Sequence, residues 1–249
     1  MRSSAAAAPG YIEAFYRHVS EIEGETVRPN DNLFDGFHNP DFFLAVSGAV
    51  KSFAVTLSKI CKDLRLMSSG PRSGWGKIQL PALSPGSSIM PGKINPTVPE
   101  MVIQIAHQIC GNDLAITMAV DEGELDLNVW DATFYKCLFE NLQLLGAEIP
   151  LLREHCVDGI VACEAHCREE AERSIALSTV VAATFGYPEG VRVAQYCEEK
   201  GCTVKTAVVE LGLMTKEEAE DPVDPLLMAE PEKMAPIVAA FKARLGILV

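Results

Sequence analysis

Between residues 43 and 64 the apolar residues recur in alternating steps of three and four, and this periodicity constrains the fold more than any other feature of the chain. The polar residues of the stretch lie off the apolar stripe. The stripe consists of Val46, Val50, Phe53, Leu57, Ile60 and Leu64. A half-buried strand would show steps of two, so the spacing predicts a long helix that packs in a bundle.

Two further long helices are expected after this one. The first begins at Pro99, which suits the first position of a helix, and runs to about residue 120. Gly111 in its interior disfavours the helix by about 1 kcal/mol relative to alanine, and we interpret it as the site of a close helix crossing. The second follows an acidic break and ends near Pro150. Three long helices with little polar surface are hard to bury in one chain, so an oligomeric bundle is expected.

The remaining sequence predicts short helices and no strands. Residues 1–10 are low in complexity and expected to be disordered, whereas 11–24 show helical spacing. Beyond residue 160 short helices are predicted at about 164–185, 188–201, 203–211, 215–220 and 231–245, the third and fourth capped by Thr203 and Thr215. The sequence therefore predicts an all-α chain, with a long-helix bundle over 11–160 and a small helical C-terminal domain over 161–249.

The composition limits the possible partners and compartments. A hydrophobic content of 48% allows a buried core, and a net charge of −13 argues against a nucleic-acid partner. The eight cysteines include no Cys-x-x-Cys pair, as is typical of a reducing compartment. No signal peptide and no stretch of membrane-spanning length is recognised, so a soluble cytoplasmic protein is expected.

The segment 84–100 carries the densest set of chemically distinct side chains in the chain. Gly86 frees the backbone, while Ser87, Lys93 and Asn95 offer a hydroxyl, a cation and an amide within nine positions. Such a loop can wrap a small polyanion. The alternative is a surface connection rich in turn-forming residues, which suits most loops of this composition.

The string from Gly86 to Glu100 resembles the signature of the aspartase/fumarase superfamily. Residues 64–74, 111–113 and 124–129 also resemble segments of these enzymes, and the similarity extends from about residue 11 to about residue 230. The resemblance implies central bundle helices followed by a small helical domain, assembled as a tetramer. It also implies an anti-elimination that releases fumarate from a succinyl compound, a chemistry that needs no organic cofactor.

The resemblance also implies roles for individual residues. Ser87 would be the base that takes the Cβ proton, and Glu100 would pair with a histidine supplied by another segment. Lys93 and Asn95 would hold a substrate carboxylate, with Ser88 beside them as a binding or loop-shaping residue. The expected loop-supporting residues are Gly86, Met90, Pro91 and Arg72.

Each of these side chains also has a purely structural interpretation. Ser88 can hydrogen-bond its own backbone, Lys93 can be solvated, and Glu100 can favour a helix N-terminus through the dipole. His107 lies among apolar residues and is interpreted as a core histidine rather than a base. A group of possible zinc ligands fits no standard zinc spacing, so no metal site is predicted there. These residues are His155, Cys156, Cys163, His166 and Cys167.

Within the superfamily the flanking segments favour an aspartase. Residues 46–51, 96–102 and 111–113 resemble aspartases more than fumarases, so reversible deamination of L-aspartate to fumarate is expected. The alternatives are a class II fumarase and a non-catalytic, truncated subunit that acts in assembly. No Thr-His segment of the family is seen, so Glu100 has no visible histidine partner in the sequence. A tetramer or association with a complementary N-terminal chain is expected, and the sequence leaves open whether the chain alone is active.

Overall fold

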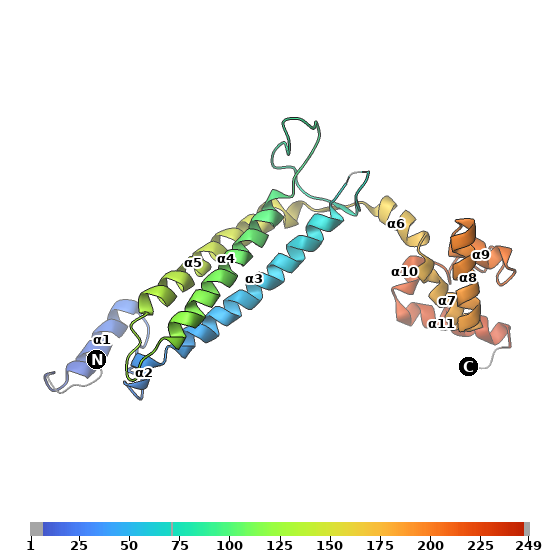
Figure 1. Ribbon diagram of the computed structural model, residues 1–249. Coiled ribbons are helices and arrows are strands. Elements are labelled where there is room, and N and C mark those ends of the chain that lie inside the picture. The colour runs from blue at the N-terminus through green and yellow to red at the C-terminus, as the bar shows by residue number, and fades with distance from the viewer. Residues whose placement is uncertain (1–6, 71, 247–249) are drawn as a thin grey trace. The chain divides into compact units, whose positions relative to one another are not determined.

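A computed structural model describes residues 7–70 and 72–246. These residues are mostly helical, so the predicted all-α class is confirmed (Figure 1). The chain divides into two compact units, residues 1–161 and 162–249. Residues 1–6 of the segment predicted to be disordered lie outside the described residues, and 7–10 form a bend and turn before the first helix.

The first unit is built on three long helices that run side by side, α3 (Asp41–Met67), α4 (Thr97–Asp121) and α5 (Asp131–His155) (Figure 1). Small residues on α3, among them Ala54 and Cys61, let α4 approach closely, since ridges of one helix pack into grooves of the next. The buried residues shared between the helices include Val102, Ile109, Ile116, Phe134, Leu138, Leu145 and Leu152. The predicted bundle of long helices is therefore present.

Two shorter helices precede the bundle, α1 (Tyr11–Glu23) and α2 (Asp35–His38). α1 begins after Gly10 and ends at Gly24, both in the left-handed conformation that glycine adopts readily. It buries none of its residues, and Phe15 and Ile22 are exposed. Its apolar face is thus unpartnered within the described chain.

A buried polar network ties α3 to α4. Ser47 Oγ donates a hydrogen bond of 2.8 Å to Asp113 Oδ1, and Lys51 forms an ion pair with the other carboxylate oxygen. One residue earlier, the side-chain amide of Asn112 donates to Asn141 Oδ1 at 2.7 Å and so joins α4 to α5. Buried hydrogen bonds of this kind specify the register of the packed helices.

The bounds of the bundle helices differ from those predicted. α4 begins two residues before Pro99, at Thr97, and α5 continues through Pro150 to His155. A proline inside a helix removes a hydrogen bond and disfavours the helix by about 3 kcal/mol. Burial of Leu152 on the following turn offsets that cost. The helix therefore continues past Pro150, where the sequence predicts its end.

The predicted close crossing at Gly111 is wrong for the described chain. Apart from the adjacent backbone of α4 itself, no described atom lies within 4 Å of the position that a Cβ of Gly111 would occupy. The same flank of α4 carries Leu114 and Met118, which are 61% and 62% exposed. Among the described residues, the helices of this chain therefore leave this flank of α4 uncovered.

Up to residue 246, where the described part of the chain ends, the second unit holds six α-helices and a short 3-10 helix around its own core. They are α6 (Glu164–Glu172), η2 (Ile175–Leu177), α7 (Ser178–Phe185), α8 (Tyr187–Lys200), α9 (Val204–Glu210), α10 (Pro225–Met228) and α11 (Pro231–Arg244). The core contains Leu177, Val181, Val193, Val204, Val208 and Phe241. α7 and α8 approach closely, because a Cβ on Gly190 would lie 2.7 Å from that of Ala182.

Two of the predicted short helices are wrong. The stretch 164–185 is broken at Ser174, whose hydroxyl accepts the Ala176 N–H and starts η2. Residues 215–220 form turns, although Thr215 and Glu218 exchange the two hydrogen bonds of a capping box. The predicted capping role of Thr215 is confirmed, but no helix follows it. Thr203 does cap a helix, by accepting the Thr206 N–H before α9.

The expectation that no stretch approaches a membrane span also needs correction. α3 is long and apolar enough to cross a membrane by length and composition alone. Its buried face nonetheless packs against α4 and α5 through Ala54, Cys61 and Leu64. A core helix of a soluble bundle passes the same test.

Candidate active site

The segment predicted to carry the chemistry lies between the bundle helices α3 and α4. After a two-residue strand β1 (Ile78–Gln79), which pairs with β2 (Val161–Ala162), the chain has no regular structure until α4 begins at Thr97. Figure 1 shows this segment extending away from the end of α4. The abundance of glycine and proline explains why no helix or strand forms here.

Two hydrogen bonds close the segment into a loop. The Gly86 N–H donates to the Lys93 carbonyl at 2.7 Å, and the Asn95 side-chain amide donates to the Gly86 carbonyl at 3.0 Å. A Cβ on Gly86 would lie 2.8 Å from the Lys93 carbonyl oxygen. Gly86 is therefore required at this pinch for a steric reason, and Asn95 helps to hold the loop shut.

Ser87 lies directly after the pinch and is half-buried. Its Oγ accepts hydrogen bonds from the backbone N–H groups of Ile89 and Met90, both at 3.1 Å. Such local bonds are common at turns. They also place two fixed donors on the oxygen, and donors of this kind stabilise a developing negative charge on it.

The closed loop surrounds a hollow of about 480 Å³. Its lining residues are Ala82, Leu83, Ser84, Pro85, Ser87, Met90, Pro91, Gly92, Lys93 and Ile94. Lys93 is exposed and forms no ion pair with any residue that the structure describes. The hollow therefore presents one hydroxyl and one uncompensated ammonium group, a combination that suits a small anion.

Glu100 lies in the first turn of α4 and is half-buried. Its Oε1 lies 3.3 Å from Arg65 Nη2 on α3. Arg65 lies in the family-like segment 64–74, but the sequence did not predict it as a site residue. Within residues 7–70 and 72–246 no histidine contacts Glu100, so its predicted histidine partner stays a prediction.

The other predicted loop residues lie on the surface. Ser88, Met90 and Pro91 are exposed on the loop. Arg72 is exposed as well and has no hydrogen bond or ion pair among the described residues. The roles predicted for these side chains remain untested by their contacts.

One histidine assignment is wrong. His107 was interpreted as a core histidine, but it lies on the exposed flank of α4. The apolar residues around it in the sequence belong to the neighbouring, buried face. Helical periodicity identified the stripes but could not tell which of them the other helices cover.

Comparison with known proteins supports the interpretation of the loop and bundle. Residues 3–111 match a family model described as "Lyase", and residues 177–230 match one described as "Fumarase C C-terminus". The aspartate ammonia-lyase of Pseudomonas canavaninivorans is 43% identical over 93% of this chain, and that of Escherichia coli K12 is 39% identical over 85% of it. The matches cover 48% and 44% of those proteins, so the chain spans about half the length of the curated relatives it matches.

Solved structures of lyases and fumarases have the same fold as this chain. The fumarate lyase:delta crystallin structure from Brucella melitensis has a TM-score of 0.86 and 40% identity, with 92% of this chain and 50% of that chain covered. The class II fumarase of Schistosoma mansoni has a TM-score of 0.85 and 27% identity, with 92% and 51% covered.

The fold and both family matches agree with an all-helical protein of the lyase type. The chain is similar to the aspartase/fumarase superfamily over both matched stretches, and the sequence relatives named above are aspartate ammonia-lyases. The resemblance inferred from the signature segment is thereby confirmed.

Proposed function

We propose that this chain forms part of an aspartate ammonia-lyase, which reversibly converts L-aspartate to fumarate and ammonia. The observation that carries the proposal is the environment of Ser87, whose Oγ accepts two backbone N–H groups inside the loop hollow that also holds Lys93. A serine is a weak base unless its alkoxide is stabilised, and these donors supply that stabilisation.

The proposed step begins at the Cβ of aspartate. The Ser87 oxygen, as alkoxide, takes the Cβ proton, and the electron pair of the broken C–H bond moves into the adjacent carboxylate to give a dianionic intermediate. That pair then forms the Cα=Cβ double bond as the Cα–N bond breaks and ammonia leaves. The proton ends on Ser87 and the carbon product is fumarate.

Carboxylate recognition is proposed for Lys93, with Asn95 and Ser88 nearby. The chain has a formal net charge of −13, so a substrate with two carboxylates needs a local cation, and the ammonium group of Lys93 supplies one. Glu100 would orient a group that arrives from outside the described residues. The chemistry as proposed uses side chains and backbone donors alone, and the proposed location is the cytoplasm.

Two other functions are supported by specific observations. The likeness to the Schistosoma class II fumarase favours hydration of fumarate to malate, which would use the same base and the same carboxylate contacts. The ion pair of Glu100 with Arg65 favours a non-catalytic role in assembly. Glu100 is bound by Arg65 and contacts no histidine among the described residues, so it lacks the partner that catalysis is expected to need.

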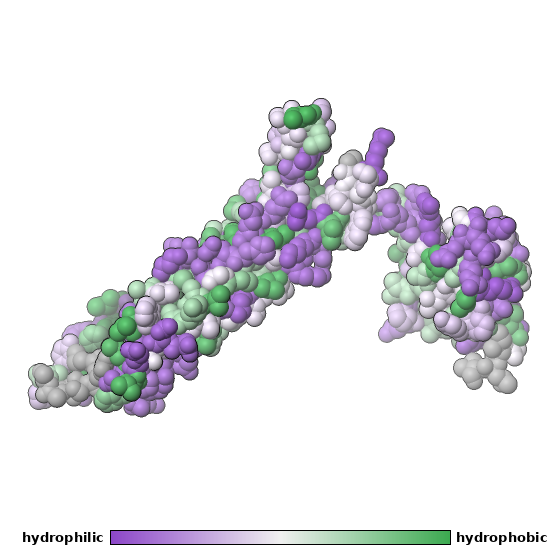
Figure 2. All heavy atoms as spheres, viewed as in Figure 1, coloured by the Kyte–Doolittle hydropathy of each residue, from purple (hydrophilic) through white to green (hydrophobic). Residues whose placement is uncertain are grey.

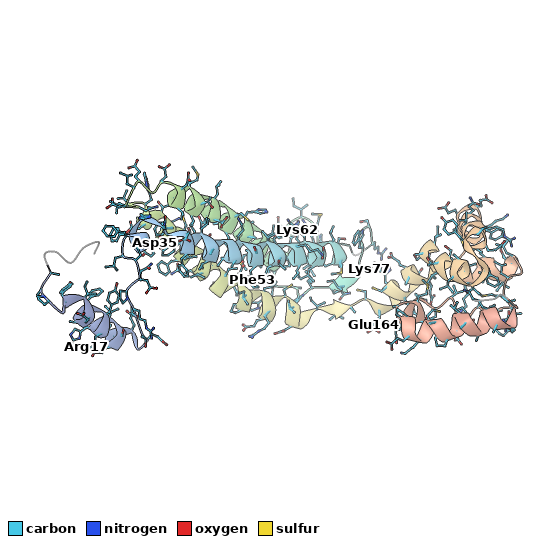
Figure 3. All side chains as sticks on the ribbon, turned by 90° about the horizontal axis from the view of Figure 1, so that it is seen from below. Arg17, Asp35, Phe53, Lys62, Lys77 and Glu164 are labelled. Atoms are coloured by element: carbon cyan, nitrogen blue, oxygen red, sulfur yellow. The ribbon has the colours of Figure 1, made fainter. Side chains whose placement is uncertain are left out.

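We also propose that the chain assembles through the flanks of its bundle, as a homotetramer or with a complementary N-terminal chain. Along α5, exposed apolar side chains recur at helical spacing, and Phe139 is 61% exposed. The others on this flank are Tyr135, Leu142 and Ile149. On α3, Phe53 is 46% exposed (Figure 3). Figure 2 shows hydrophobic side chains reaching the surface along the visible face of the bundle. Contiguous exposed apolar surface of this kind marks an interaction site.

Ultraviolet absorbance of fumarate tests the catalytic proposal. Purified chain is assayed with L-aspartate and separately with L-malate, for wild type, Ser87→Ala and Ser73→Ala. We expect an aspartate-dependent signal that Ser87→Ala reduces by at least about 100-fold, whereas the exposed Ser73, outside the hollow, is dispensable. A signal from malate alone would favour the fumarase. Silence with both substrates from a folded, helical protein would contradict catalysis by this chain and favour the assembly role.

The molar mass in solution tests the assembly proposal. Phe139→Glu places a charge on the apolar flank of α5 and is expected to shift the mass towards the monomer while helicity is retained. Gln143→Glu, an exposed polar position on the same helix, serves as the matched control and should leave the mass unchanged. A monomeric wild-type chain would refute the proposal.

A further inference from the structure

Glu148 on α5 is a buried carboxyl group without a partner. It is 1% exposed, and neither carboxyl oxygen has a hydrogen-bond partner among the described residues. Leu145 and Leu152 lie about one turn before and after it and belong to the apolar core of the bundle. The proposed reaction does not use Glu148, so its burial calls for a separate explanation.

Two thiols lie near Glu148, and neither can balance a negative charge. Cys61 from α3 and Cys156, just after α5, are buried nearby, and burial raises the pKa of both thiols, that of Cys61 to about 11. Both are therefore neutral near pH 7. α4 contributes apolar residues to this core, among them Val102 and Ile109.

Several other charged groups of the bundle pair with each other. The buried Asp113 is bound by Ser47 and Lys51, and Arg65 pairs with Glu100 at the surface. Among the residues described, no cation pairs with either carboxyl oxygen of Glu148. Burial alone raises the pKa of Glu148 from 4.5 to about 7, because an ionised carboxylate without a partner is strongly disfavoured in an apolar core.

We propose that Glu148 is a pH-sensitive switch: its neutral form lets α5 pack in the core, and its ionisation loosens the part of the bundle that carries Arg65 and Glu100. The link to those two residues is direct in the chain. The core next to Glu148 contains Leu64, which precedes Arg65, and Val102 in the turn that follows Glu100. The switch does not depend on the proposed reaction, since it concerns the packing of the helices.

The direction of the pH dependence follows from the raised pKa. Stability contributed by neutral Glu148 is fully present below the unfolded pKa of 4.5 and is lost as pH rises from there to about 7, above which it is constant. The difference between a pKa of 4.5 in the unfolded chain and about 7 in the folded chain corresponds to a roughly 300-fold rise in the unfolding equilibrium constant.

Urea unfolding of the full chain between about pH 5 and pH 8 tests the proposal. We expect the wild-type unfolding constant to rise by about two orders of magnitude, and the variant Glu148→Gln to lose that rise. Glu154→Gln changes an exposed position on the same helix. Its unfolding constant should rise with pH as much as that of the wild type. If Glu148→Gln does not fold, Glu148→Met serves in its place, because apolar replacements of buried charges are well tolerated.

Two further measurements make the result unambiguous. The infrared band of a protonated carboxylic acid should be present in the wild type at pH 6 and absent from the folded Glu148 variant. Hydrogen exchange at residues 62–69 and 100–104, after correction for the intrinsic rate, should accelerate above pH 7 in the wild type only. The proposal would be overturned if the unfolding constant of the Glu148 variant rose with pH as steeply as that of the wild type, or if Glu148 were ionised at pH 6.

Discussion

Arg65 on α3 and Glu100 in the first turn of α4 form an ion pair, with Nη2 and Oε1 3.3 Å apart. The pair connects the end of one bundle helix to the start of the next, at the two points where the loop segment leaves and rejoins the bundle. It therefore holds the two ends of the segment that carries Ser87 and Lys93.

The Arg65–Glu100 pair is expected to affect function more than stability. Both side chains are about 40% exposed, 43% and 38%, and pairs exposed to this degree contribute about 0.2–1 kcal/mol. A double-mutant cycle with Arg65→Met and Glu100→Gln should give a coupling in that range, weakened by salt. Fumarate formation should fall in both single variants. A coupling of zero at low salt would show that the pair does not form in solution.

Gly86→Ala should disrupt the loop and leave the bundle intact. The new Cβ would lie 2.8 Å from the Lys93 carbonyl oxygen, so the pinch must open and Ser87 must move. We expect fumarate formation to fall by about 100-fold, as small displacements of catalytic groups do, with little change in the melting temperature. Gly48→Ala, a helical position with open space around it, is the control and should be slightly stabilising. Full activity in Gly86→Ala would exclude the closed loop as the active form.

Asp113→Ala should destabilise the bundle. The change leaves the buried Ser47 hydroxyl without its acceptor and removes the partner of Lys51, and an unsatisfied buried group costs about 1–3 kcal/mol. Asp113→Asn keeps an acceptor for Ser47 and should cost less. Urea unfolding measures both, with Asp63→Asn as the control, since Asp63 belongs to an exposed pair on α3. Equal effects of Asp113→Ala and Asp63→Asn would contradict a structural role for the network.

Cys61 should resist alkylation in the folded chain. It is fully buried, and burial raises the pKa of its thiol to about 11, so almost no reactive thiolate is present near pH 7.5. Mass spectrometry after timed labelling with iodoacetamide should show Cys61 reacting more than about 100-fold slower than the partly exposed Cys163. Labelling in urea should abolish the difference. Rapid labelling of Cys61 without denaturant would mean that the bundle opens readily.

Much of the candidate site could be predicted from the sequence because its residues are local. Gly86, Ser87, Lys93 and Asn95 occupy one short segment, so a single folded loop brings them together whatever the rest of the chain does. Arg65 could not be assigned to Glu100 in the same way. The two residues meet only because α3 and α4 pack side by side, a relation that spacing along the chain does not encode.

The sequence by itself determined the helical class, the long bundle helices and the position of the signature loop, since periodicity and glycine and proline content act over short distances. Only the tertiary structure decided which stripe of each helix is covered. It left Gly111 and His107 exposed, carried α5 through Pro150, and enclosed Glu148 without a partner among the residues that the structure describes. These outcomes depend on packing between distant segments, where the burial of neighbouring side chains outweighs local preference.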